Sequence, residues 1–133
     1  PDPDAPCAAI APEFTVGSFR DFDTVCRFGR GLDVLTIEIE SVNLAALKQL
    51  RDEGVQVFPQ PEVVELIQDK RRQKEFFREK ALPTSDFVLT ENREDTRQHA
   101  DFLPAFHKLG TGGYDGRGVQ RIATEADFAK AFD

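Results

Sequence analysis

A glycine-rich loop is the part of this sequence best suited to chemistry. The stretch HKLGTGGYDGRGVQRI, residues 107–122, places glycines at positions 110, 112, 113, 116 and 118 around Tyr114, Asp115 and Arg117. Backbone N–H groups of such a loop can fold over phosphates, and Lys108 and Arg117 can add charge-assisted contacts. The loop fits neither the Walker pattern nor GxGxxG, because Asp115 stands where the last glycine should be. By spacing alone, a plain glycine-rich turn therefore remains the alternative.

Two glutamates form a second candidate site. The run GLDVLTIEIE, residues 31–40, is apolar and β-branched and turns polar at its end, which predicts a buried parallel strand. Glu38 and Glu40 then lie at its carboxyl end, where open α/β sheets bind ligands. The period of two places both on one face, so one of them can be structural.

The elements around these residues predict an α/β layer. Helical spacing covers residues 19–30 and 43–54, with Asn43 as the N-cap and Gly54 as the stop, and residues 55–59 predict a further strand. Alternating helices and strands with short connections are typical of α/β folds. Such a sheet normally starts with a strand and a glycine turn, so we expect this chain to be a piece of a longer protein.

A change of composition after Pro59-Gln60-Pro61 predicts a second domain. Residues 61–83 are helical and dense in charge, and an apolar gap divides them into two helices, the second capped by Asp69. A strand over 84–90, a short helix from Asn92 and two short strands flanking the glycine loop follow. We therefore predict an incomplete first domain over residues 1–59 and a second over 60–133.

Composition excludes some function classes. The net charge of -7 and the pI near 4.9 argue against a nucleic-acid partner, which needs a basic face. No apolar run reaches the roughly 18 residues of a membrane span, so we expect no membrane partner and a cytoplasmic location. The cysteines and histidines form no recognisable metal set.

Four segments together resemble one enzyme family. KLGTGGYDGRG resembles the loop of the ATP-grasp family of N5-carboxyaminoimidazole ribonucleotide synthetases, whose pattern contains GGYDG[KR]G. DPDAPCAAIA, VLTIEIESVN and PQPEVVELIQDKRRQKEFFREKALPTSDF resemble three further segments of that family, in its order and spacing. The resemblance implies an α/β fold, namely part of a Rossmann-like pre-ATP-grasp domain followed by the start of an ATP-grasp domain.

The resemblance also implies roles for particular residues. Lys70 and Lys108 become candidate ATP ligands, and Glu38 a candidate ligand of the substrate's ribose. Lys108 and Asp115 are the implied catalytic residues, with Asp115 orienting the attacking amine. Tyr114, Asp115 and Arg117 are also implied to bind the substrate. The implied flap over ATP consists of Gly113, Tyr114, Asp115, Gly116, Arg117, Gly118 and Val119.

The implied reaction is the ATP-dependent carboxylation of aminoimidazole ribonucleotide with bicarbonate, a ligase step of purine biosynthesis. The resemblance places the Mg²⁺ ligands downstream of this chain, so we expect no metal site in it, no turnover by it alone, and a homodimeric full-length enzyme. Two alternatives remain: a formate-dependent glycinamide ribonucleotide transformylase, and a non-catalytic nucleotide-binding or scaffold fragment. Two positions depart from the family pattern, since Gly110 replaces an arginine and Val119 a glutamine.

Overall fold

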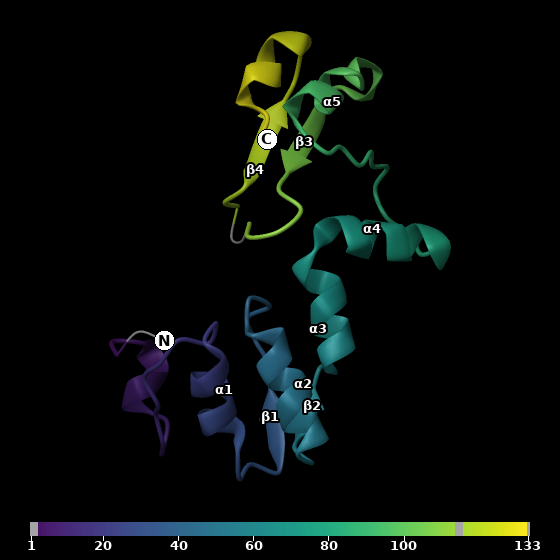
Figure 1. Ribbon diagram of the computed structural model, residues 1–133. Coiled ribbons are helices and arrows are strands. Elements are labelled where there is room, and N and C mark those ends of the chain that lie inside the picture. The colour runs from purple at the N-terminus through teal and green to yellow at the C-terminus, as the bar shows by residue number, and fades with distance from the viewer. Residues whose placement is uncertain (1–2, 114–115, 133) are drawn as a thin grey trace. The chain divides into compact units, whose positions relative to one another are not determined.

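The computed structural model describes residues 3–113 and 116–132 and divides the chain into two compact units, Pro1–Glu65 and Leu66–Asp133. The division falls within a helix, a few residues after the boundary predicted at residues 59 and 60. Helices and strands alternate in the first unit, and the second combines helices with a hairpin (Figure 1), so the predicted α/β class is confirmed. None of the helices in the described part of the chain is long and apolar enough to cross a membrane.

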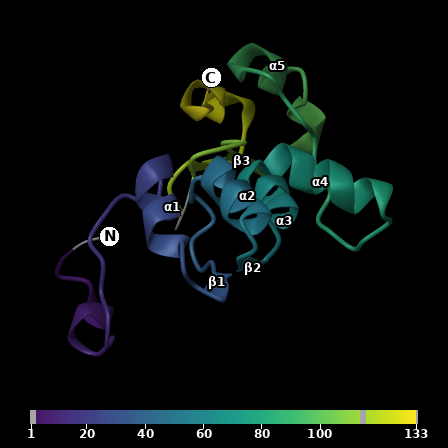
Figure 2. The same cartoon turned by 60° about the horizontal axis from the view of Figure 1, so that its bottom comes forward.

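The first unit is a small α/β layer. It contains a 3-10 turn at Pro6–Ala9, then α1 (Phe22–Gly29), β1 (Val34–Thr36), α2 (Leu44–Asp52), β2 (Gln56–Phe58) and most of α3 (Pro61–Gln68). β1 and β2 pair in parallel, with Leu35 opposite Val57. Helices α1 and α2 pack against each other beside these strands (Figures 1 and 2).

Apolar side chains from each of these helices and strands meet in one core. Their burial is the main driving force for this layer. The core consists of Val25, Cys26, Leu35, Val42, Ala46, Leu47, Leu50, Val55, Val57 and Val64.

The capping predictions for the first unit are confirmed. The Asn43 side chain accepts a hydrogen bond from the Ala46 amide at 2.9 Å and so satisfies a free donor in the first turn of α2. Gly54 follows the end of α2 with φ of 101°, a conformation that glycine adopts without strain.

The strand predicted over residues 31–40 is correct only in its middle. β1 ends at Thr36, and Glu38 and Glu40 lie in a bend and a turn rather than on one face of a strand. The parallel ladder pairs Val34 with Gln56, Leu35 with Val57 and Thr36 with Phe58, and it does not continue past Thr36. The Ile37 amide makes the last contact, donating to the Phe58 carbonyl at 3.0 Å.

The second unit is built on a β-hairpin. After α4 (Lys70–Glu79) come α5 (Arg93–Arg97), a 3-10 turn at Ala100–Phe102, β3 (Ala105–Lys108), β4 (Val119–Ile122) and a 3-10 helix at Glu125–Lys130. β3 and β4 are antiparallel, with Lys108 opposite Val119 at the loop end. The predicted break after α3, the Asp69 cap of α4 and the hairpin flanking the glycine loop are all confirmed.

The strand predicted over residues 84–90 is wrong. Its Val, Leu and Thr content favours a strand, but the segment has no ladder partner in the described part of the chain. Lys74 of α4 holds the start of the segment instead. Its ammonium donates to Thr84 Oγ1 at 2.5 Å and to Ser85 Oγ at 3.0 Å. Side-chain contacts thus fix this extended stretch without a sheet.

Candidate functional site

The glycine loop closes on itself at the end of the hairpin. The Leu109 amide donates to the Gly118 carbonyl at 2.9 Å, which extends the β3–β4 pairing into the loop. Gly112, Gly116 and Gly118 have φ values of 77°, 80° and 69°, which disfavour any side chain. A Cβ on Gly113 would lie 2.7 Å from the Arg117 carbonyl oxygen. Close backbone approach therefore requires glycine at position 113.

Lys70, the first residue of α4, ties this loop to the helix at two points. Its backbone N–H donates to the Gly110 carbonyl at 2.8 Å, and its side-chain Nζ donates to the Gly113 carbonyl at 3.0 Å. Lys70 and Gly113 are 43 positions apart in the sequence. The structure thus brings the predicted Lys70 and the predicted Gly113 together.

Asp69 and Arg71 reinforce the same junction. Arg71 donates to Asp69 through Nε at 3.1 Å and Nη2 at 2.9 Å, a bidentate pair, while Asp69 also accepts the Arg71 backbone N–H and so caps α4. The hydrogen bond from Arg71 lowers the pKa of Asp69, and the pairing raises the pKa of Arg71. Both groups are therefore charged over the whole neutral range.

Sequence reasoning missed Arg71. In the sequence, Gly110 stands where the family pattern has an arginine. Nothing in the sequence, however, indicates that Arg71 lies next to position 110.

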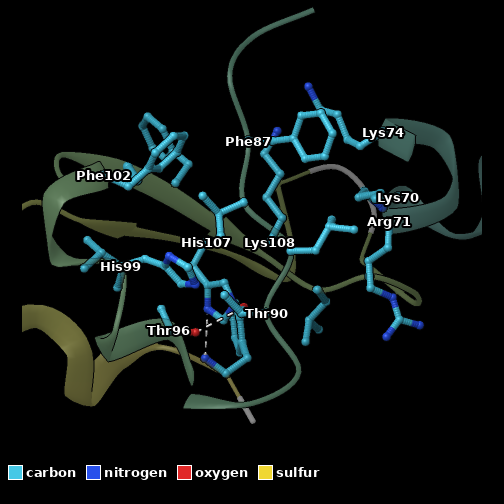
Figure 3. A pocket seen from close by; sticks show the side chains of 18 of the residues that line it. Lys70, Arg71, Lys74, Phe87, Thr90, Thr96, His99, Phe102, His107 and Lys108 are labelled. Atoms are coloured by element: carbon cyan, nitrogen blue, oxygen red, sulfur yellow. Dashed lines mark hydrogen bonds between the residues drawn. The ribbon is translucent and has the colours of Figure 1, made fainter. Parts of the chain in front are cut away.

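A cavity of about 870 Å³ lies beside the loop, within the second unit. Its lining includes the start of α4, residues 85–92, β3 and the first part of the glycine loop. Figure 3 labels Lys70, Phe87 and Lys108 among the lining side chains. Four cations contribute to it: Lys70, Arg71 and Lys74 from α4, and Lys108 from β3. The Lys108 side chain is exposed, and the cation-rich side of the cavity suits an anionic ligand.

An aromatic ring adjoins two cations at this cavity. Lys74 Nζ lies 5.4 Å from the centroid of the Phe87 ring and Arg78 Cζ lies 5.5 Å from it, both within the range of cation–π attraction. His99 and Phe102 lie on the other side of the cavity from Lys70 and Arg71 (Figure 3). The cavity therefore combines a charged side with a more apolar one.

The other predicted residues are placed less informatively. Gly116, Gly118 and Val119 lie in the loop or at its junction with β4, and Arg117 is exposed and lies outside the lining of the cavity. Glu38 is exposed and belongs to the first unit. Tyr114 and Asp115 lie outside the described residues, so their predicted roles stay predictions.

The described residues offer no obvious metal centre. Among residues 3–113 and 116–132, no group of three or more His, Cys, Asp or Glu side chains is placed to hold a metal ion. The cavity lining carries the carboxylates Asp86 and Glu91 beside its four cations, and its cationic side suits phosphate oxygens.

Comparison with known proteins identifies the family. The sequence pattern of the ribonucleotide synthetase preATP-grasp domain matches residues 1–68, about half of the chain. The chain belongs to the ribonucleotide synthetase preATP-grasp family.

Relatives of known name agree with this assignment. An N5-carboxyaminoimidazole ribonucleotide synthase of Pseudomonas aeruginosa is 32% identical over 134 residues, covering 99% of this chain and 37% of the relative. The carboxyaminoimidazole ribonucleotide synthase of Aspergillus clavatus, solved with ATP, superposes with a TM-score of 0.84 at 28% identity, over 96% of this chain and 35% of that one. The resemblance predicted from the sequence motifs is thereby confirmed.

A second Aspergillus clavatus structure holds both a nucleotide and a ribonucleotide substrate. It is an N5-carboxyaminoimidazole synthase in complex with ADP and 5-aminoimidazole ribonucleotide, and it superposes with a TM-score of 0.75 at 25% identity, over 92% of this chain and 32% of that one. The present chain thus spans about a third of the length of these proteins.

Proposed function

We propose that the full-length protein containing this chain carboxylates aminoimidazole ribonucleotide, using ATP and bicarbonate, to give N5-carboxyaminoimidazole ribonucleotide, ADP and phosphate. The observation that carries this proposal is the junction of Lys70 with the glycine loop beside the cation-lined cavity. Its relatives are enzymes named for this product, and one of their structures holds ADP and 5-aminoimidazole ribonucleotide.

ATP is proposed to bind through its phosphates. The described loop residues Gly113 and Gly116 to Val119 have backbone N–H groups, and Lys70 has N–H donors left after its bond to the Gly113 carbonyl. Lys108 on β3 adds a second ammonium from the cavity lining. Lys70 would therefore contact the loop and a phosphate at once, which fixes the loop against the nucleotide.

The substrate is proposed to bind through the tip of the loop and through the first unit. Tyr114, Asp115 and Arg117 are assigned to the amine and phosphate of the ribonucleotide, and Glu38 to its ribose. Asp115 orients the exocyclic amine and receives its proton as the new N–C bond forms. Lys108 and Asp115 are the proposed catalytic residues.

The chemistry proposed for this site is phosphoryl transfer followed by carboxylation. A bicarbonate oxygen attacks the γ-phosphorus of ATP, giving carboxyphosphate and ADP. The substrate amine then takes the carboxyl carbon as phosphate leaves. Mg²⁺ would neutralise charge on the transferring phosphoryl group. This chain's residues bind, orient and exclude water, while the metal ligands belong to the rest of the full-length protein.

Three further parts of the proposal concern the whole protein. It acts in the cytoplasm, it forms a homodimer, and residues 1–133 alone show no turnover, because the resemblance places the metal ligands downstream of them. Bicarbonate-dependent ADP release by the 133-residue chain would contradict the last of these.

The proposal is tested by ADP release from the full-length protein with Mg-ATP and bicarbonate, with and without aminoimidazole ribonucleotide. We expect the ribonucleotide to stimulate ADP release and the double substitution Tyr114→Phe, Asp115→Asn to abolish that stimulation. Stimulation by glycinamide ribonucleotide and formate would instead establish the transformylase alternative. No stimulation by either nucleotide would favour a non-catalytic role.

The role of Lys108 has its own matched control. Lys108→Ala should raise the KM for ATP about 10- to 100-fold, because a charge-assisted hydrogen bond contributes roughly 1.5–3 kcal/mol. Lys80→Ala removes the same charge from an exposed position at the end of α4 and should leave that KM within about twofold. Equal effects of the two substitutions would show that only overall charge matters.

A further inference from the structure

The space beside Gly110 is already filled by another residue. A Cβ built on Gly110 would lie 2.6 Å from Arg71 Nε, 3.1 Å from Cδ and 3.2 Å from Cζ. The φ angle of Gly110 lies outside the left-handed range, so its backbone conformation would accept alanine. Occupied space, and not backbone conformation, therefore requires glycine at position 110.

Arg71 is held in that space by Asp69. The two hydrogen bonds to Asp69, from Nε and Nη2, fix the plane of the guanidinium, and the Asp69 carboxylate is itself fixed as the cap of α4. A long arginine side chain normally swings aside at little cost. Here it must give up a bidentate ion pair to do so.

The same glycine carries one of the contacts that position Lys70. The Gly110 carbonyl accepts the Lys70 amide, and the Lys70 ammonium reaches the Gly113 carbonyl further along the loop. Figure 3 shows Lys70 and Arg71 together at one side of the cavity. Arg71 thus rests on the point where the loop meets α4.

We propose that Arg71 is a positioning residue for the glycine loop and that Arg71 and Gly110 act as a coupled pair. The guanidinium, fixed by Asp69, sets how closely the loop approaches α4, and so holds Lys70 where it contacts Gly113. The consequence for ATP rests on the proposed function, in which Lys70 and the loop bind the phosphates.

The pair makes a specific prediction about substitutions. Alanine at position 110 must push Arg71 away from Asp69 or move the Gly110 carbonyl away from the Lys70 amide. Once Arg71 is replaced by alanine, the space next to position 110 is empty and can accommodate the Cβ of Ala at that position. The damage done by Gly110→Ala should therefore depend on Arg71.

A double-mutant cycle in the full-length protein measures this dependence. The dissociation constant of Mg-ATP is compared among the unsubstituted protein, Gly110→Ala, Arg71→Ala and the double variant. We expect Gly110→Ala to weaken binding about tenfold, Arg71→Ala about threefold, and the double variant no more than about threefold. Effects that multiply in the double variant would overturn the pair.

The neighbouring Arg72 provides the matched control. It carries the same charge on the same turn of α4, is exposed and lies outside the lining of the cavity. Arg72→Ala should change ATP affinity less than about twofold and should not alter the effect of Gly110→Ala. If Arg72→Ala suppresses the loss of ATP affinity in Gly110→Ala as Arg71→Ala does, the coupling arises from the overall charge of α4 and not from the contact between Arg71 and Gly110.

Hydrogen exchange of the Lys70 amide separates this inference from the proposed function. That amide should exchange faster in Gly110→Ala than in the unsubstituted protein, and alanine at position 110 should cause no such acceleration when Arg71 is also alanine. Failure of the unsubstituted protein to bind Mg-ATP would refute the proposed function, yet the exchange rates would still decide the pair. Unchanged exchange in Gly110→Ala would refute the pair whatever the ATP affinity.

Discussion

Each of the two units of this chain is stabilised internally by a different kind of contact. In the first unit, three helices and two strands share an apolar core, and its ion pairs, such as Arg30 with Glu53, lie at the surface. In the described part of the second unit, the buried core residues are Ile122, Phe128 and Ala131. Polar contacts there connect segments far apart in the sequence, as Lys70 connects to Gly113.

This difference matters for where a function can develop. Apolar packing is non-directional and stabilises a layer as a whole, whereas a hydrogen bond fixes one atom against another. The first unit is therefore stabilised as a whole by its apolar core. In the second unit, two hydrogen bonds from Lys70 fix the position of the glycine loop, as the proposed phosphate-binding flap requires.

The largest expected effect tests how strongly the apolar core stabilises the first unit. Leu50 is fully buried in the first core, so Leu50→Ala should lower the free energy of opening of this unit by about 2–5 kcal/mol. Leu82→Ala, at a residue of the second unit that is 45% exposed, should lower the free energy of opening of the second unit by less than about 0.5 kcal/mol. Hydrogen exchange of the amides of α2 measures the first value. Equal costs would mean that the comparison between the units is mistaken.

Two glycines sharpen the same comparison. A Cβ on Gly29 would lie 2.4 Å from Leu50 Cδ1 in the first core, whereas one on Gly113 would meet the Arg117 carbonyl in the loop. Gly29→Ala should therefore cost about 1–3 kcal/mol of stability through overpacking and leave ATP affinity unchanged. Gly113→Ala should instead weaken ATP binding and leave stability nearly unchanged, because the loop backbone must move away from Lys70.

The melting temperature and the dissociation constant of Mg-ATP, measured on both variants of the full-length protein, separate these outcomes. A loss of ATP affinity in Gly29→Ala comparable to that in Gly113→Ala would show that the two units do not divide stability and binding between them.

Local signals made much of the fold predictable. Asn43 before α2, Asp69 before α4 and the two short apolar runs around the glycine loop each act through neighbours in the sequence, and each is confirmed. Thr124 and Asp127 form a capping box that begins the last 3-10 helix.

The failed predictions depend on partners that lie elsewhere in the chain. A strand exists only when another strand pairs with it, so residues 84–90 and the end of the run at Glu38 could not be judged from their own composition. The contact of Arg71 with Gly110 joins two distant positions, and no local pattern encodes it. For the candidate site, the sequence therefore predicted Lys70 and the loop but not what holds them together.

The smallest expected effect concerns pH and the second unit. His107 on β3 accepts the Phe132 backbone N–H through Nδ1 at 3.2 Å, and its ring lies 5.7 Å from the Phe132 ring. Burial lowers the pKa of His107 below its usual 6.5. The unfolded chain then takes up a proton at higher pH than the folded protein does, so stability is full above about pH 6.5 and falls as the pH drops below it.

His107→Gln should flatten this dependence, because a glutamine amide oxygen can accept the same N–H and does not titrate. Melting temperatures of the full-length protein between about pH 5.5 and 7.5 measure the effect, and His99→Gln, at the other histidine of this chain, is the control. The carboxylates are the same in all three proteins, so a difference in slope isolates one histidine. If the slope of melting temperature against pH is unchanged in His107→Gln, the contact of His107 with Phe132 makes no pH-dependent contribution to stability. The partial burial of His107 would then have no effect on stability that His99 lacks.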